Sequence, residues 1–209
     1  MRARSRTGTS SSLPHSPSLD RWVEALLATP GLTAIRDPAE AWRVHVEESL
    51  TAVEVARRFD GPIVDVGSGG GAPGIPLAAA LPEREVTLLE ANARKCVFLE
   101  RAVREFPNVR VVRGRAEEQT IDAYGVALAK ALAPPPVAAE WCLPLVAPGG
   151  ASILFVGPTA DAEAVGRVAE HLGAGPPEVH GGLLVVPKLG PTPPGFPRRP
   201  GVARKRPLA

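Results

Sequence analysis

The stretch that most constrains the fold is residues 63–77, IVDVGSGGGAPGIPL. Residues 63–66 form an apolar-leaning run with one acid, Asp65, which is typical of a buried parallel strand. Four of the next five positions are glycines, and the chain resumes as a helix from Ala72, with Pro73 in its first turn. Glycines let the backbone approach a ligand closely and adopt positive φ. A strand, a glycine turn and a helix in this order predict a nucleotide-shaped ligand at the carboxyl end of the strand.

Strand and helix patterns alternate along residues 61–190. The strands are predicted at 62–66, 85–90, 108–112, 125–130 and 150–155, and the helices between and after them at 73–81, 92–105, 134–147 and 160–172. Parallel strands joined by helices predict an α/β fold with a doubly wound, Rossmann-like sheet. A hairpin near 176–188 would add an antiparallel edge strand.

Residues 18–60 are predicted to form an N-terminal helical layer against the sheet. The first helix spans 18–28, with Ser18 as its N-cap. The second begins with Asp37 as N-cap and continues to about Phe59. Its apolar stripe recurs at helical spacing, at Trp42, Val46, Leu50 and Val53.

The positive charge of the chain is concentrated at its two ends. Residues 1–17 are predicted to be a disordered basic arm, and the Pro-rich residues 191–209 a flexible basic tail. The chain has 24 Lys and Arg against 22 Asp and Glu, and these ends hold eight of the basic residues and none of the acidic ones, which leaves a net charge of −6 on residues 19–190. Basic arms on an acidic body favour a polyanionic partner, and solubilising segments are the alternative.

The remaining composition favours a cytoplasmic protein. Cys96 and Cys142 lie in apolar helical patterns, and we expect buried free thiols rather than a disulfide. No apolar run approaches the roughly 20 residues of a membrane span, and the N-terminus lacks the apolar core of a secretory signal. The lack of a membrane span predicts no membrane partner. No His/Cys cluster has metal-ligand spacing, so we also predict no metal.

Glu90 ends the second predicted strand, about twenty residues after the glycine turn. A carboxylate at this place can accept hydrogen bonds from both hydroxyls of a ribose. Ala91 follows and can touch the sugar or the base through its backbone. The alternative for Glu90 is an exposed acid that stabilises a helix N-terminus.

The glycine turn is compatible with two kinds of cofactor. Gly69, Gly71 and Gly74 match the dinucleotide pattern GxGxxG, but Pro73 removes one of the N–H groups that a pyrophosphate needs. A cofactor without phosphate, such as S-adenosylmethionine, needs only close approach and an acid near its amino group. Asp65 is a candidate for that acid. The pattern therefore favours a methyltransferase over an NAD-linked oxidoreductase.

Several stretches resemble one bacterial family: DVGSGGGAPGIPLA, LLEANARKCVFLERAV, NVRVVRGRAEE, LTAIRDPAEAWRVHVEES and PTPPGFPRRPGVARKRPL. The family is the ribosomal RNA small subunit methyltransferase G family, also called the glucose-inhibited division protein B family, and the resemblance covers about residues 32–209. It implies that residues 61–190 are a methyltransferase domain that binds S-adenosyl-L-methionine. It also implies methylation of N7 of one guanine in 16S ribosomal RNA.

The resemblance assigns further residues to the cofactor. Gly67 and Ala72 match positions that hold it at the first turn, beside Gly69, and Ala116 and Glu117 match positions that frame adenine. The Ala116 N–H can meet an adenine ring nitrogen, and the Glu117 carboxylate can accept from the exocyclic amine. Without the resemblance, a solvated turn would be the preferred interpretation of the two glutamates that begin at Glu117.

The chain departs twice from the family pattern. Where the family has Ser-Arg-Ala after the fourth strand, this chain has Lys130 between two alanines, which keeps the charge but loses the planar fork of Arg. Where the family usually has Lys-Gly after the fifth strand, this chain has Val156 before its glycine. We expect Lys130 to contact the carboxylate of the cofactor or the RNA.

The implied reaction needs no catalytic side chain, because guanine N7 carries a lone pair and no proton. Catalysis would then be positioning, and no residue is assigned a catalytic role. The expected partner is 16S ribosomal RNA or the small ribosomal subunit, bound by a monomer whose basic tails neutralise phosphates. The alternatives are a methyltransferase on another substrate and an RNA-binding protein that has lost its activity.

Overall fold

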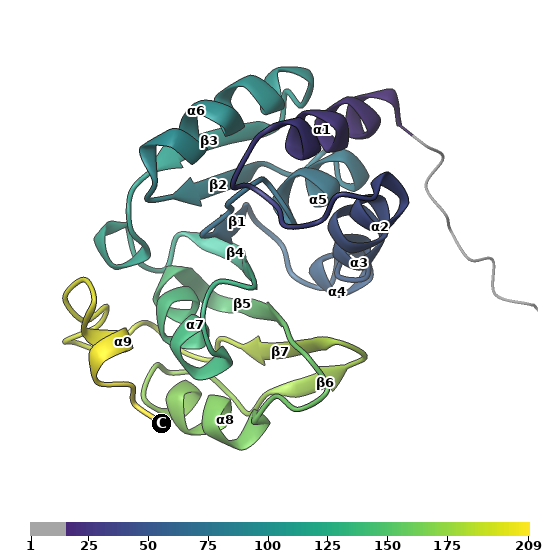
Figure 1. Cartoon of the computed structure of the whole chain (residues 1–209). Coiled ribbons are helices and arrows are strands. Elements are labelled where there is room, and N and C mark those ends of the chain that lie inside the picture. Colours follow the sequence, from purple (N-terminus) through teal and green to yellow (C-terminus); the bar gives the residue numbers. More distant parts are fainter. Residues whose placement is uncertain (1–15) are drawn as a thin grey trace, which may run out of the picture.

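The computed structural model describes residues 16–209, which form a seven-stranded sheet with helices on both faces (Figure 1). The strands are β1 (Ile63–Val66), β2 (Val86–Glu90), β3 (Val109–Arg113), β4 (Tyr124–Lys130), β5 (Val146–Phe155), β6 (Glu178–His180) and β7 (Leu183–Pro187). Their order is β3-β2-β1-β4-β5-β7-β6, in which β1 to β5 pair in parallel and the β6–β7 hairpin adds antiparallel strands. The predicted doubly wound α/β fold is confirmed.

Helices connect the parallel strands and cover the sheet. They are α1 (Pro17–Ala28), α2 (Pro38–Trp42), α3 (Glu48–Leu50), α4 (Val53–Ala56), α5 (Gly74–Ala80), α6 (Ala93–Ala102), α7 (Pro135–Cys142), α8 (Ala162–Glu170) and α9 (Val202–Lys205). A π-helical turn (Arg43–Glu47) joins α2 to α3, and 3-10 turns lie at Val103–Glu105, Ala116–Glu118 and Leu143–Leu145. In Figure 1, α1 to α6 gather around β1 to β3, and α7 and α8 lie beside β4, β5 and β7.

Two apolar cores lie on opposite faces of the sheet. Ile63 of β1 belongs to the core under α1 to α6, whereas its neighbour Val64 belongs to the core under α7 and α8, because successive strand residues point to opposite faces. All four β1 residues are buried, as expected for a central parallel strand. Cys96 and Cys142 are free and buried, as predicted.

The strand order reverses at β1, whose neighbours are β2 on one side and β4 on the other. In an open α/β sheet, ligands bind at such a switch point, beyond the carboxyl ends of the strands. The loops after β1, β2 and β4 meet there. The fold therefore brings the glycine turn, Glu90 and Lys130 to one edge of the sheet.

The N-terminal layer is present but differs in detail from the prediction. Helix α1 begins one residue earlier, with Ser16 at the N-cap position, and the Ser18 hydroxyl instead donates a hydrogen bond to Glu105 Oε2 at 2.7 Å. Asp37 does cap the second helix by accepting from the Glu40 N–H at 2.8 Å. The second helix is broken into α2, the π-helical turn, α3 and α4, so the prediction of a single helix to about Phe59 was wrong.

Residues 191–209 were expected to be a flexible tail, and in the structure they pack against the body. Thr192 donates through Oγ1 to Asp122 Oδ1 at 2.7 Å, and the Arg198 guanidinium forms two 2.5 Å hydrogen bonds with Glu140. The segment contains α9, whose Ala203 is only 2% exposed. The many prolines suggested an unpacked chain, but they do not prevent side chains from docking. The predicted disordered arm of residues 1–17 lies almost wholly outside the described residues.

Candidate active site

The glycine turn after β1 forms part of the wall of the site. Gly67 and Gly69 have φ of +70° and +58°, where side chains with a Cβ are strained. A Cβ on Gly67 would also lie 2.3 Å from Leu132 Cδ1, so the Leu132 side chain would have to move to make room for it. The Trp22 indole of α1 donates to the Gly70 carbonyl at 2.9 Å and ties the turn to the N-terminal layer.

Glu90 at the end of β2 fixes the position of this turn. Its Oε2 accepts from the Gly69 N–H at 2.9 Å, and its Oε1 accepts from the Asn92 N–H at 2.7 Å. The residue is 7% exposed and lines a cavity. A carboxylate has about four acceptor sites, so two remain for hydroxyl donors from a ligand.

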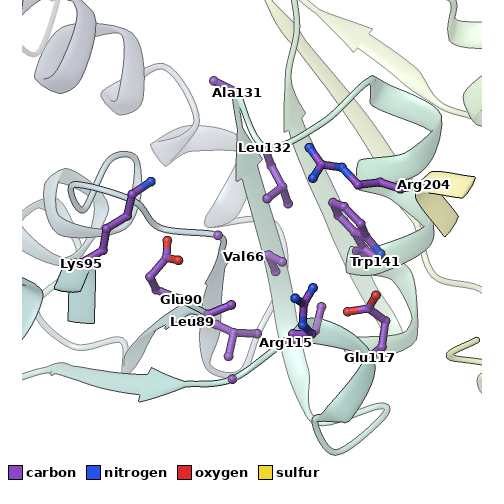
Figure 2. Close-up of a pocket in the computed structure, with 14 residues that line it drawn as sticks. Val66, Leu89, Glu90, Lys95, Arg115, Glu117, Ala131, Leu132, Trp141 and Arg204 are labelled. Carbon is purple, nitrogen blue, oxygen red and sulfur yellow. The ribbon is translucent and has the colours of Figure 1, made fainter. Parts of the chain in front are cut away.

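That cavity, of about 270 Å³, is the centre of the site (Figure 2). Glu90 and Lys95 lie on one side of it, and Trp141 and Arg204 lie on the opposite side. It has fourteen lining residues, among them the predicted Gly67, Glu90, Ala91, Ala116 and Glu117. The structure therefore brings together predicted residues from the loops that follow β1, β2 and β3.

A second cavity, of about 260 Å³, adjoins the first and shares Gly67, Lys95 and Ala131 with it. The predicted residues that line it include Gly69, Ala72 and Lys130. A third cavity, of about 610 Å³, shares Lys130 and Ala131 with the second and continues past the end of β5, where Phe155 and Val156 line it. The three cavities thus form a series along the carboxyl ends of the strands.

Ala116 and Glu117 lie in the 3-10 turn after β3 and line the first cavity. Arg115 precedes this turn, and its backbone N–H donates to Glu118 Oε2 at 3.3 Å. Glu117 Oε1 accepts from the Gly201 N–H at 3.1 Å, so this carboxylate also anchors the C-terminal segment. The prediction from the family motif did not include that second role.

Asp65 was expected to lie near the cofactor, but it lines none of the three cavities. It is 1% exposed, and its Oδ2 accepts from the Gly74 N–H at 3.0 Å, at the start of α5. Burial raises the pKa of the Asp65 carboxyl to about 7, and the nearby Glu90 charge acts in the same direction. Asp65 therefore joins β1 to α5 beneath the turn, and its expected action on a cofactor amino group, directly or through water, stays a prediction.

Lys130 at the end of β4 lies between the second and third cavities. Its Nζ donates to the Val44 carbonyl, lies 3.3 Å from Glu48 Oε2, and is 5.6 Å from the centre of the Phe155 ring. Burial lowers its pKa, and the Glu48 charge opposes that shift. This geometry turns Lys130 toward the N-terminal layer, at the boundary between the two cavities.

The sequence analysis did not name several lining residues, among them Lys95, Trp141 and Arg204. Lys95 in the first turn of α6 lines the first two cavities, and Trp141 of α7 and Arg204 of α9 lie on the far side of the first (Figure 2). The sequence marks Lys95 only by its position three residues after Asn92, the N-cap of α6. Nothing in the sequence pattern indicates that α9 reaches the site, since that contact depends on tertiary docking.

Comparisons with known proteins agree with this geometry. The family model described as rRNA small subunit methyltransferase G matches residues 17–172. The chain belongs to this family. A ribosomal RNA small subunit methyltransferase G from Moorella thermoacetica is 37% identical over 199 residues, which cover 85% of this chain and 82% of the relative. One from Salinispora tropica is 42% identical over 174 residues, which cover 74% and 70%.

Solved structures support the same fold. A predicted O-methyltransferase from Agrobacterium tumefaciens superposes with a TM-score of 0.55 at 19% identity, over 66% of this chain and 78% of that one. At this identity the likeness concerns the fold alone. Within residues 16–209, no helix is both long and apolar enough to cross a membrane, and no group of three or more Asp, Glu, His or Cys side chains could hold a metal ion.

Proposed function

We propose that this member of the rRNA small subunit methyltransferase G family transfers a methyl group from S-adenosylmethionine to N7 of a guanine in 16S ribosomal RNA. The observation that carries the proposal is the pair of adjoining cavities, in which the family's cofactor motifs meet around Gly67. One cavity has the acceptors that an adenosine needs, and the other continues along the glycine turn toward Lys130.

The residues present fit the cofactor without phosphate. Glu90 has acceptor sites left for the ribose hydroxyls, and Ala116 and Glu117 present a backbone N–H and a carboxylate at the adenine end. Lys95, which lines both cavities, is the cation best placed for the carboxylate of the methionine part. When bound, S-adenosylmethionine supplies an electrophilic methyl group.

The side chains of this protein then position the guanine and exclude water. The third cavity opens beside Lys130 and offers the Phe155 ring as an apolar wall for a base. Because guanine N7 has no proton to remove, no general base is required. Lys130 lines both the second and the third cavity, and its pairing with Glu48 beside the third favours contact with the RNA over contact with the cofactor carboxylate. We also expect the protein to act in the cytoplasm as a monomer.

The experiment that tests the proposal is complementation of a strain that lacks its own enzyme of this family. Borohydride reduction and aniline cleavage reveal 7-methylguanine in the isolated 16S ribosomal RNA. We expect the cleavage band to be absent from the deletion strain and restored by this chain. A band that stays absent, although the purified protein binds S-adenosylhomocysteine, would assign the chain to another substrate. Loss of that binding as well would fit an RNA-binding protein without activity.

A further inference from the structure

We propose that the C-terminal segment completes the cofactor pocket, with Arg204 lying against the adenine ring, so that docking of the segment and binding of the cofactor stabilise each other. The inference rests on the proposed function, because it needs an adenosine in the first cavity. It adds a cofactor-binding residue and a coupling that the glycine turn and Glu90 do not provide.

The segment is anchored to the body by a buried ion pair. Arg198 Nε and Nη2 each lie 2.5 Å from an oxygen of Glu140, in the two-pronged arrangement that suits guanidinium and carboxylate. The Glu140 side chain is only 3% exposed. Removing the segment would leave this carboxylate buried without its cation, which is strongly unfavourable. The docked arrangement is therefore part of the fold.

The anchor belongs to the same helix as the pocket wall. Glu140 and Trp141 are neighbours on α7, and the guanidinium of Arg204 lies 6.0 Å from the centre of the Trp141 ring. Figure 2 shows these two side chains together on the side of the cavity opposite Glu90. A planar guanidinium stacks well on an aromatic base as well as on indole. Arg204 can thus contact an adenine whose ribose is held by Glu90.

A second anchor joins the segment to the adenine end directly. Glu117 Oε1 accepts the Gly201 N–H at 3.1 Å, three residues before Arg204. The other oxygen, Oε2, can then accept from the exocyclic amine of adenine. One carboxylate therefore contacts both the segment and the ligand. If the cofactor favours the docked segment, the docked segment must favour the cofactor by the same factor.

Arg204→Ala in the full chain tests the contact, with Arg206→Ala as the matched control. Both arginines are exposed, and only Arg204 lines the cavity. Calorimetric titration with S-adenosylhomocysteine should give about tenfold weaker binding for Arg204→Ala, since the stacking contact with the base is lost. Arg206→Ala should stay within twofold. Arg204→Lys should recover only part of the loss, because it keeps the charge and lacks the plane.

Repeating the titration with adenosine shows which part of the ligand Arg204 contacts. The loss for Arg204→Ala should be the same with adenosine as with S-adenosylhomocysteine, because Arg204 lies at the adenine end. Amide hydrogen exchange measures the coupling: S-adenosylhomocysteine should slow exchange in residues 201–206 of the wild-type chain about fivefold or more, and much less in Arg204→Ala.

Two results would overturn the inference: equal affinities of Arg204→Ala and the wild type, or unchanged exchange in residues 201–206 when the ligand binds. The exchange measurement on the wild type decides the coupling even if a variant fails to fold. If the 7-methylguanine mark is restored while either result is obtained, only the inference fails. If the wild type binds the ligand as expected but leaves the mark absent, only the proposed RNA substrate fails.

Discussion

The two sides of the first cavity are built in different ways. One side comes from consecutive elements within residues 67–95, the glycine turn, Glu90 and Lys95, in which backbone N–H groups fix the position of one carboxylate. The opposite side is assembled from separate segments, with Trp141 on α7 and Arg204 on α9. We call the first the backbone-built side, because it depends on backbone conformation. We call the second the assembled side, because it depends on side-chain docking.

This difference indicates a division of roles. The backbone-built side has little freedom, because its glycines have positive φ and its carboxylate has two backbone donors. It suits the ribose, whose two hydroxyls need fixed acceptors. The assembled side can respond to a ligand, because part of it belongs to a segment held by a few contacts. We therefore expect larger losses of binding from changes on the backbone-built side.

Glu90→Gln should produce the largest effect. The amide would place an N–H₂ group against the N–H of either Gly69 or Asn92, and it would present a weaker acceptor to the ribose. Losing one to two charge-assisted hydrogen bonds at about 1.5–3 kcal/mol each predicts roughly 100-fold weaker binding of S-adenosylhomocysteine. Calorimetric titration measures this, with the exposed Glu100→Gln on α6 as control. A loss below threefold would contradict the role of Glu90.

Asp65→Asn tests the support beneath the same side through pH. The folded pKa of Asp65 is raised to about 7, above its unfolded value near 3.9, so the folded state holds the proton more tightly. This contribution is fully present below about pH 4 and is lost as pH rises through about 7. At about 1.4 kcal/mol per unit, the wild type should lose on the order of 3 kcal/mol more than the variant over that range.

Urea unfolding at pH 4, 5.5, 7 and 8 provides the measurement for Asp65→Asn. The Asn side chain can still accept the Gly74 N–H, so the variant should fold and serve as its own reference. The difference between the two unfolding free energies should grow with pH. Parallel pH profiles for the wild type and the variant would show that Asp65 titrates normally in the fold.

Most of the backbone-built side could be predicted from the sequence. The order of strand, glycines and acid is local, so it indicated both the doubly wound sheet and the place of Glu90. The hydrogen bond of Asp65 with the Gly74 N–H was not predicted, because only the three-dimensional turn brings the start of α5 to this carboxylate. Local patterns identify such residues but do not determine which way their side chains point.

The assembled side could be predicted only in part. Ala116 and Glu117 were found through the family motif, whereas Arg204 was missed because the tail was expected to be flexible. Proline spacing predicts little regular structure in a segment, and it does not show whether the segment docks. The Arg198–Glu140 pair joins residues 58 positions apart, and no periodic pattern predicts such a contact.

Lys130→Ala tests whether Lys130 contacts the RNA or the cofactor. Lys130 is paired with Glu48 beside the third cavity, so its loss should remove a cation and expose an acid to the RNA. With a charge-assisted contact of about 2 kcal/mol, kcat/KM for methylation should fall roughly 20-fold. Binding of S-adenosylhomocysteine should stay within threefold. A tenfold loss of that binding would instead give Lys130 the cofactor carboxylate as its partner.

The smallest expected effect is a difference between two tryptophans, one near the backbone-built side and one on the assembled side. The Trp22 indole N–H donates to the Gly70 carbonyl at 2.9 Å, whereas the buried indole N–H of Trp141 has no hydrogen-bond partner within residues 16–209. Phenylalanine removes the same N–H from both sites. Trp22→Phe therefore leaves a carbonyl unpaired, and Trp141→Phe removes a donor that was already unsatisfied.

The unfolding free energy should fall by about 1 kcal/mol more for Trp22→Phe than for Trp141→Phe, as expected for one net hydrogen bond. Trp22 is also more fully buried than Trp141, so replacing it with Phe leaves the larger cavity. This adds to the difference in unfolding free energy between the two variants. Binding should follow the opposite order, since Trp141 lines the first cavity and supports Arg204, whereas Trp22 acts only beneath the turn. Equal stability losses in denaturant titrations, together with equal affinities for S-adenosylhomocysteine, would mean that the two sides do not differ in construction as their hydrogen bonds indicate.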